Sequence, residues 1–232
     1  MKVRLVSKTT VAPGYVKYLL EELKVPEEFK DVIENPEGLI AYIARVSSPN
    51  QSSMKYAGLI KYCMAHGHWS ILEMCNVVFE IETTRMISPQ ILRHRSLSFQ
   101  EFSQRYAAVD GIELYAARRQ DEKNRQSSLD DLPLDVQNQW MNIQIANWND
   151  VQKNYQWALD NGIAKECARA ILPLQTKTKL YANGTMRSWV HYLASRTDPA
   201  TQKEHREIAD AIQALCVDEF PIIAEAAGWI KD

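Results

Sequence analysis

The residues best suited to chemistry lie in one stretch, positions 90 to 106, which reads Gln-Ile-Leu-Arg-His-Arg-Ser-Leu-Ser-Phe-Gln-Glu-Phe-Ser-Gln-Arg-Tyr. It holds three arginines and a histidine but a single carboxylate, Glu101. An arginine side chain is a planar, permanently charged fork that binds the paired oxygens of a phosphate or carboxylate. Serine hydroxyls and backbone N–H groups of the same loop can complete an anion-binding surface. The simpler alternative is a solvated basic helix end, where Arg and His are favoured by the helix dipole.

The spacing within this stretch favours a binding site over a solvated helix end. Arg93-His94-Arg95 is followed by seven residues and then by Ser103, and Glu101 and Arg105 lie two residues to either side of that serine. This pattern resembles the signature of the flavin-dependent thymidylate synthases, Arg-His-Arg-x7-Ser. The longer motif of that family also has counterparts here, namely Gln90, Ser98 and Tyr106.

The second half of the chain supplies three more arginines in the order and spacing of the same family. Arg169 precedes Leu172-Pro173, and Arg187 and Arg196 follow in an Arg-Ser-x-x-x-Tyr-Leu-x-x-Arg pattern. Taken alone, Arg169 would read as a surface arginine whose stem covers apolar neighbours or which pairs with Glu166. With these positions included, the resemblance covers roughly residues 40 to 220.

The resemblance implies reductive methylation of dUMP to dTMP, with methylenetetrahydrofolate as the carbon donor and NADPH-reduced FAD as the hydride source. It implies a homotetramer with shared sites. The residues expected to hold dUMP are Gln90, Arg93, Glu101, Ser103, Gln104, Arg105, Arg169 and Arg196. The residues expected to hold FAD are Ser47, His68, Ser70, Glu73, Arg93, His94, Arg95, Glu101, Thr185, Arg187 and His191.

The expected catalytic residues are Arg196 and Ser103, and the expected mechanism has no covalent enzyme nucleophile. An arginine at the uracil edge stabilises negative charge on the ring and so makes its carbon 5 nucleophilic. Ser103 has no histidine base in its own segment that would make it a nucleophile. Departures from the family pattern concern the flavin contacts: Thr185-Met186 replaces Asn-Ala, His191 replaces Asn, and the segment from His68 to Met74 lacks a proline and a second histidine.

Composition excludes several broad classes of protein. With 232 residues, 46% of them hydrophobic and 24% charged, the chain suits one soluble globular domain over residues 1–232. A net charge of −2 argues against a surface that binds nucleic acid or anionic membranes. No apolar run reaches the roughly 20 residues of a membrane span, and the N-terminal residues lack a signal-peptide pattern. We therefore expect a cytoplasmic protein, in the host cytoplasm if the source is viral.

Cysteine and histidine carry little further signal in this sequence. The four cysteines are far apart among apolar neighbours, as expected of reduced core thiols, and none adjoins a cluster of positive charge: Cys63, Cys75, Cys167 and Cys216. His66 and His68 have no third ligand nearby, so we expect no metal site. We expect His205 on a helix surface.

Periodicity predicts an α+β fold, a single mixed domain of long helices packed with a small antiparallel sheet. Period-two alternation predicts an edge strand over residues 2–7, a strand from Cys75 to Ile81, and another from Leu174 to Leu180 that ends at Asn183-Gly184. Because these strands do not alternate regularly with helices, a doubly wound sheet is disfavoured.

Period-3.6 patterns predict the helices. They cover residues 134–160, with Val136, Trp140 and Tyr155 inward, and residues 186–195, followed by a last long helix capped by Asp198-Pro199. Residues 118–132 are too polar for a core element and read as a long loop, a kind of segment that is often functional.

Two other functions remain open at this point. The first is a nucleic-acid-binding module, in which the arginines of residues 93–125 would contact the phosphate backbone of the nucleic acid. Its affinity for nucleic acid would fall steeply with salt, and it would not bind flavin. A nucleotide-binding regulator would keep the dUMP site but lose flavin chemistry through the changes at Thr185 and His191. The register of Ser103 favours the enzyme over both.

Overall fold

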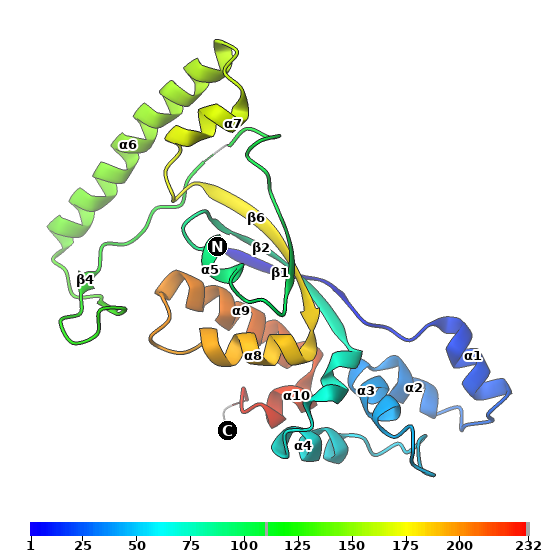
Figure 1. Ribbon diagram of the computed structural model, residues 1–232. Coiled ribbons are helices and arrows are strands. Elements are labelled where there is room, and N and C mark those ends of the chain that lie inside the picture. Colours follow the sequence, from blue (N-terminus) through cyan, green and yellow to red (C-terminus); the bar gives the residue numbers. More distant parts are fainter. Residues whose placement is uncertain (110, 231–232) are drawn as a thin grey trace.

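The framework of the protein is a four-stranded antiparallel sheet in the order β1-β2-β6-β3, seen in a computed structural model that describes residues 1–109 and 111–230 (Figure 1). The central strands β2 (Asn76–Thr84) and β6 (Lys177–Thr185) pair along their whole length. Outside them lie β1 (Lys2–Lys8) and β3 (Ser98–Glu101). A separate short hairpin joins β4 (Arg119–Gln120) and β5 (Ser128–Leu129). The predicted α+β class is confirmed.

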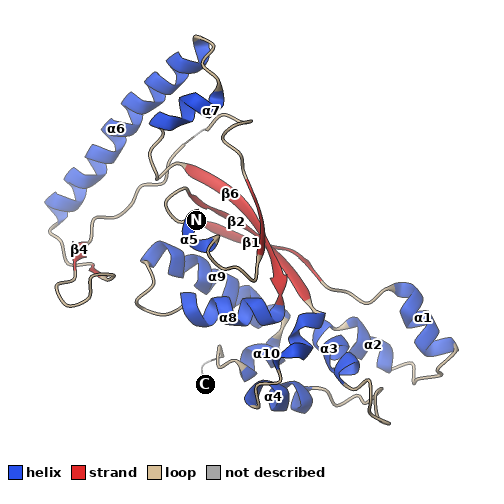
Figure 2. Ribbon diagram, in the orientation of Figure 1, coloured by secondary structure: helices blue, strands red, loops and turns tan. Residues whose placement is uncertain are grey.

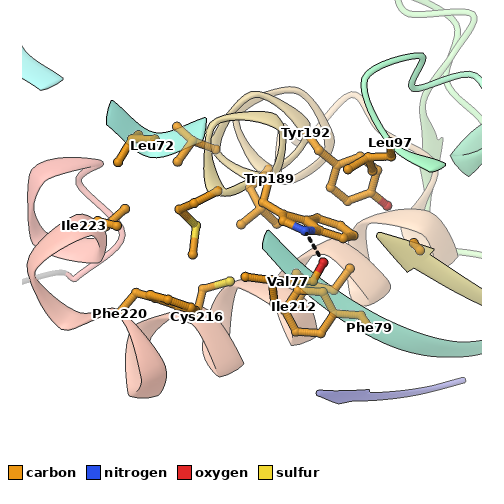
Figure 3. Packing of buried hydrophobic residues seen from close by; sticks show 14 of the residues in the cluster. Leu72, Val77, Phe79, Leu97, Trp189, Tyr192, Ile212, Cys216, Phe220 and Ile223 are labelled. Carbon is orange, nitrogen blue, oxygen red and sulfur yellow. Dashed lines mark hydrogen bonds between the residues drawn. The ribbon is translucent and has the colours of Figure 1, made fainter. Parts of the chain in front are cut away.

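The main core lies between the sheet and helices α8 (Met186–Arg196) and α9 (Lys203–Glu219). Trp189 of α8 is fully buried, packs edge-to-face on Phe79 of β2, and donates its indole N–H to the carbonyl of Val77 at 3.1 Å (Figure 3). Helices α10 (Pro221–Ala226) and α4 (Ala57–Ala65) close the end of this core. The core thereby fixes α8, the helix that carries two of the predicted site arginines.

The N-terminal helices form a second, smaller core. It is built by α1 (Pro13–Glu21), α2 (Phe29–Glu34) and α3 (Pro36–Ala44). Asn35 begins α3 by accepting hydrogen bonds from the backbone N–H groups of Glu37 and Gly38, as an N-cap residue does. The 3₁₀ turn Trp69–Met74 then leads from α4 into β2.

Helix α6 (Leu134–Asp160) extends away from the sheet as a long arm, with α7 (Lys165–Ala168) beside its far end (Figure 2). The buried amide of Gln144 ties it to the body by exchanging two hydrogen bonds with the backbone of Tyr115. The helix bounds are as predicted, but the predicted inner face is not covered by this chain: Val136 and Trp140 are exposed, and only Tyr155 is buried. The helix therefore presents apolar side chains outward.

Several other boundaries differ from the prediction for identifiable reasons. β6 continues through Asn183-Gly184 to Thr185 because these residues pair with Val78, Val77 and Asn76 of β2. Position 184 requires a glycine, since a Cβ there would meet the side chain of Leu97 at 2.1 Å. Asp198 closes a turn with Ala200, and the long helix begins only at Lys203. It is the last long helix of the described residues, as predicted, and the short α10 follows it. Within the described ranges, no helix has the length and apolarity needed to cross a bilayer.

Candidate functional site

Glu101 and its neighbours occupy the edge formed by β3 and β6. The stretch predicted as a loop begins as a strand, because Ser98 to Glu101 pair with Asn183 to Leu180 of β6. Within it, the Glu101 carboxylate accepts a hydrogen bond from Thr178 at 2.9 Å and pairs with Arg85 at the same distance. Neither partner was predicted from sequence. Together they hold Glu101 in one orientation beside the motif serine.

Arg105 and Arg169 are brought together by one residue, Glu166. Arg105 pairs with Glu166 at 3.1 Å, and the Nε of Arg169 donates to the Glu166 backbone carbonyl. Ser103 lies two residues before Arg105 and accepts its backbone N–H. The structure therefore unites three predicted nucleotide-binding residues from distant segments, on an exposed surface suited to an anion.

Gln90 and Arg196 line a common open cavity of about 450 Å³, although they are more than 100 residues apart in sequence. The short helix α5 (Ser88–Ile91) carries Gln90, and the last turn of α8 carries Arg196. The Gln90 amide donates to Gln202 at 2.8 Å and accepts a longer contact of 3.4 Å from the buried His205. The prediction that His205 lies on the surface is wrong, because it packs under the site.

His94 follows α5 and lies edge-to-face on Tyr192, with ring centroids 5.4 Å apart. Burial, with smaller contributions from the charges of Arg196 and His191, lowers the pKa of His94 despite a backbone hydrogen bond involving Ser188 that raises it. The imidazole is therefore neutral at pH 7, so it can act as a hydrogen-bond donor and acceptor without adding charge.

Several predicted flavin-binding residues meet where β6 turns into α8. Thr185 is the N-cap of α8 and accepts the backbone N–H of Ser188, which shows how threonine replaces asparagine at this position. Arg187 forms an ion pair with Glu73, and the rings of His191 and Trp69 lie 5.4 Å apart. Helix α8 and the 3₁₀ turn thus share one wall of the predicted site.

Five further predicted residues are exposed. Arg93 and Arg95 point from the turn after α5, and neither forms an ion pair with any residue the structure describes. The others are Ser47, His68 and Ser70. A different cavity of about 370 Å³ lies over the sheet beside Lys2, Lys177 and Lys179 and contains none of the predicted residues.

Three predicted site residues have buried nitrogen atoms that find no hydrogen-bond partner in the described part of the chain: His94 Nε2, Gln104 Nε2 and Arg196 Nε. A buried unpaired polar atom is costly, so native proteins usually satisfy it. These polar atoms fit polar ligands such as a nucleotide and a flavin. Of the described residues, no group of three His, Cys, Asp or Glu side chains could hold a metal ion.

The cysteines agree only in part with the prediction. Burial raises the pKa of the Cys63 thiol, that of Cys75 to about 11 and that of Cys216 to about 12. These three are protonated and inert at pH 7. Cys167 is exposed on α7, so its prediction as a core thiol is wrong.

The predicted residues form two groups on one chain. One group lies around Gln90, His94 and Arg196, where α5 and α8 meet. The other contains Arg105 and Arg169 beside α7. Figure 1 shows α7 next to the arm α6 and α8 below the sheet, well separated in the view.

Comparison with known proteins identifies the family. The family model described as thymidylate synthase complementing protein matches residues 28–222. A flavin-dependent thymidylate synthase of Synechocystis is 55% identical over 84% of this chain and 91% of its own length. A probable flavin-dependent thymidylate synthase of Paramecium bursaria Chlorella virus 1 is 48% identical over 90% of this chain and 98% of its own.

A solved structure shows the same fold. It is the UMP/dUMP methylase PolB of Streptomyces cacaoi bound with 5-Br dUMP, with a TM-score of 0.77 at 23% identity over 99% of this chain and 95% of its own. With the motif residues in register and the family model covering most of the chain, this protein belongs to the flavin-dependent thymidylate synthase family.

Proposed function

We propose that this protein catalyses the reductive methylation of dUMP to dTMP, with methylenetetrahydrofolate as the carbon donor, FAD as cofactor and NADPH as reductant, in the cytoplasm. The observation that carries the proposal is the convergence of Gln90, His94 and Arg196 from distant segments, two of them with buried, unpaired nitrogens. The names of the relatives support the substrate and the flavin.

Arg196 is the residue that we assign to the uracil ring. Its head group lines the open cavity together with Gln90, and its Nε finds no partner among the described residues. A guanidinium at the ring edge stabilises the negative charge on the ring that makes carbon 5 nucleophilic, which is electrostatic catalysis without a covalent enzyme bond. The raised pKa values of the three buried thiols support a route without a cysteine nucleophile.

The arginines around Glu166 are assigned to the nucleotide phosphate. Arg105 is held by the Glu166 carboxylate and Arg169 by its backbone carbonyl, which leaves further guanidinium N–H groups free to bind an anion. Ser103 and Gln104 lie beside them, and the buried Gln104 amide supplies another donor. Here Ser103 binds and orients the nucleotide and does not act as a nucleophile.

The residues fit a flavin on the α8 side of the site. Arg187, His191, Thr185 and Glu73 line the wall described above, and the exposed Arg93, Arg95, Ser47, His68 and Ser70 complete the set. Bound there, FAD would supply the hydride that completes the methyl group. The protein's own part is to orient the nucleotide against the flavin and to exclude water.

We also propose that four copies assemble and share their sites. The arm α6 has exposed apolar side chains along its length, a kind of surface that marks an interface when it is this extensive. They are Leu134, Val136, Trp140, Met141, Ile143, Ile145 and Trp157. Packing of α6 against another copy would bury them and would bring the Arg105 group to the Arg196 group of a neighbour.

Light scattering on a gel-filtration column tests the assembly. Met141→Glu with Ile145→Glu places charge on the exposed apolar surface and should yield smaller species. Asn142→Glu is the matched control, because this exposed residue is already polar and should leave the assembly intact. An unchanged mass for the double variant would contradict packing through α6.

Nucleotide chromatography tests the reaction itself. Purified protein is incubated with dUMP, methylenetetrahydrofolate, FAD and NADPH, and each component is omitted in turn. We expect dTMP only from the complete mixture. No dTMP from the complete mixture, with dUMP bound and FAD not bound, would favour the nucleotide-binding regulator.

A further inference from the structure

The site is backed by a chain of side-chain hydrogen bonds that runs from Arg118 through Glu204, Gln202, Gln90 and His205 to Tyr192. The distances along it are 2.9, 3.0, 2.8, 3.4 and 3.0 Å in that order. Glu204 and His205 are buried. Arg118, which binds Glu204, lies in the long loop of residues 118–132, to which the sequence motifs assign no particular role.

The direction of every hydrogen bond in this chain is set by one carboxylate. Arg118 only donates, and with both nitrogens of its fork it occupies both oxygens of Glu204. Because the ionised carboxylate only accepts, Gln202 must turn its NH₂ group toward Glu204 and its carbonyl oxygen toward Gln90. Gln90 must then donate to Gln202 and turn its own carbonyl oxygen toward His205.

The same constraint passes through the histidine. His205 must carry its proton on Nδ1 to donate to Gln90, so its Nε2 accepts from the hydroxyl of Tyr192. Burial, with a smaller contribution from the charge of Arg196, lowers the pKa of His205 to about 4, so one ring nitrogen is unprotonated at pH 7. Each member thus has a single consistent role as donor or acceptor.

We propose that this chain fixes the amide of Gln90 in one orientation toward the nucleotide, which makes His205 and Glu204 positioning residues for base recognition. With one N–H given to Gln202 and one lone pair to His205, Gln90 keeps one N–H and one lone pair for the cavity that it shares with Arg196. A donor and an acceptor on one rigid amide complement the imide edge of a uracil. This inference rests on the proposed function, since it assigns Gln90 to dUMP.

A matched pair of substitutions separates positioning from packing. The amide nitrogen of Asn lies where His has Nδ1, and that of Gln lies where His has Nε2. His205→Asn therefore keeps the donor toward Gln90 and loses the contact with Tyr192. His205→Gln loses Gln90 and keeps a hydrogen bond with Tyr192, whose hydroxyl then accepts from the amide N–H. Both variants remove the imidazole, so a merely structural role would affect both alike.

Calorimetric titration of dUMP into the FAD-loaded protein gives the decisive values. We expect His205→Gln to raise the Kd for dUMP about tenfold, the worth of one buried hydrogen bond, and His205→Asn to stay within about threefold of wild type. The Kd for FAD should be unchanged in both. In a Gln90→Ala background, His205→Gln should have no further effect on dUMP, because the residue through which it acts is gone.

The outcomes distinguish this inference from the proposed function. A wild-type protein that does not bind dUMP would overturn both. Normal dUMP binding by wild type with equal affinities in the two His205 variants would overturn the inference alone. If a His205 variant does not fold, Glu204→Gln tests the same chain from the other end, since an amide there lets Gln202 and Gln90 flip and should weaken dUMP binding about tenfold. Unchanged dUMP affinity in that variant would also overturn the inference.

Discussion

The two halves of the site use the same kind of ion pair in opposite surroundings. Around Gln90, the Arg118–Glu204 pair is buried, with side chains 13% and 10% exposed. Around Ser103, the Arg105–Glu166 pair leaves its side chains 55% and 53% exposed. The first pair is closed within one chain and organises the side that we assign to the base. The second pair is exposed to solvent, so we expect that Arg105 can bind a phosphate, or a residue of a neighbouring copy, in place of Glu166.

The difference in burial between the two ion pairs indicates which part of the site is rigid. Fixed orientation comes from groups withdrawn from water, where each hydrogen bond is strong and its loss is costly. Anion binding comes from groups that stay hydrated and mobile until the ligand arrives. Predictions that break one half or the other should therefore differ in size and in kind.

Removing the buried carboxylate should have the largest effect on stability. Glu204→Ala leaves Arg118 partly buried and unpaired, and it removes the anchor of the Gln90 chain. We expect a loss of about 3–5 kcal/mol in the free energy of unfolding. Urea denaturation followed by circular dichroism measures this value. A loss below about 1 kcal/mol would show that the Arg118–Glu204 pair contributes no more to stability than an exposed ion pair does.

Arg196→Lys should affect catalysis more than stability. A lysine keeps the charge but cannot reproduce the planar fork at the ring edge, so turnover should fall about 10²–10³-fold. The measurement is kcat for dTMP formation, with the melting temperature as the control for folding. Near-normal kcat would remove Arg196 from the catalytic role.

Two buried carboxyls should respond to pH with opposite sign. Glu37 accepts the backbone N–H of Ile223, and its burial raises its pKa to about 7. Because the folded chain holds this proton more tightly than the unfolded chain, the contribution of Glu37 to stability is most favourable below its unfolded pKa of about 4.5 and falls as pH rises to about 7. The full change is on the order of 3 kcal/mol. Glu37→Gln should abolish it in unfolding free energies measured between pH 5 and 8, and an unchanged pH profile would refute the assignment.

The pKa of Glu204 moves the other way. Burial opposes its charge, but the hydrogen bonds from Arg118 and Gln202 outweigh burial and lower its pKa. Its contribution is therefore present at neutral pH and is lost as the pH falls through the acid range. Comparing the acid unfolding of wild type with that of Glu204→Gln isolates this contribution.

The exposed pair should give the smallest effect. Glu166→Ala removes a partner of Arg105 at the surface, and we expect a change below about 1 kcal/mol in unfolding free energy that shrinks further in high salt. The thermal melting temperature at low and high salt measures it. A loss as large as that of Glu204→Ala would show that the two halves do not differ as described.

Sequence patterns predicted the elements whose burial is set locally. The alternation of β2 and the period of α8 each reflect one continuous buried face, and the structure has both elements. The bounds of α6 were also predicted, although most of its predicted inner face is exposed. Strand β3 was missed because only four residues form it, and half of them are exposed polar side chains. Its pairing with β6 depends on a contact between distant segments.

The site was predicted as a list of residues but not as an arrangement. The motifs identified Gln90 and Glu101, whereas their partners Gln202 and Arg85 have no local signal. For His205 a signal existed, since it lies three and seven residues before the buried Ile208 and Ile212, on the inner face of α9. Its polar neighbours Glu204 and Arg206 concealed that spacing.

The flavin spectrum tests the central claim most directly. FAD is titrated into the purified protein, and the visible absorption of the bound flavin is recorded before and after addition of dUMP. If both ligands share one pocket, the flavin should bind and its spectrum should shift with dUMP. The assignment of this site would be contradicted if the protein bound no FAD at high FAD concentration, or if the spectrum of the bound flavin did not change when dUMP was added.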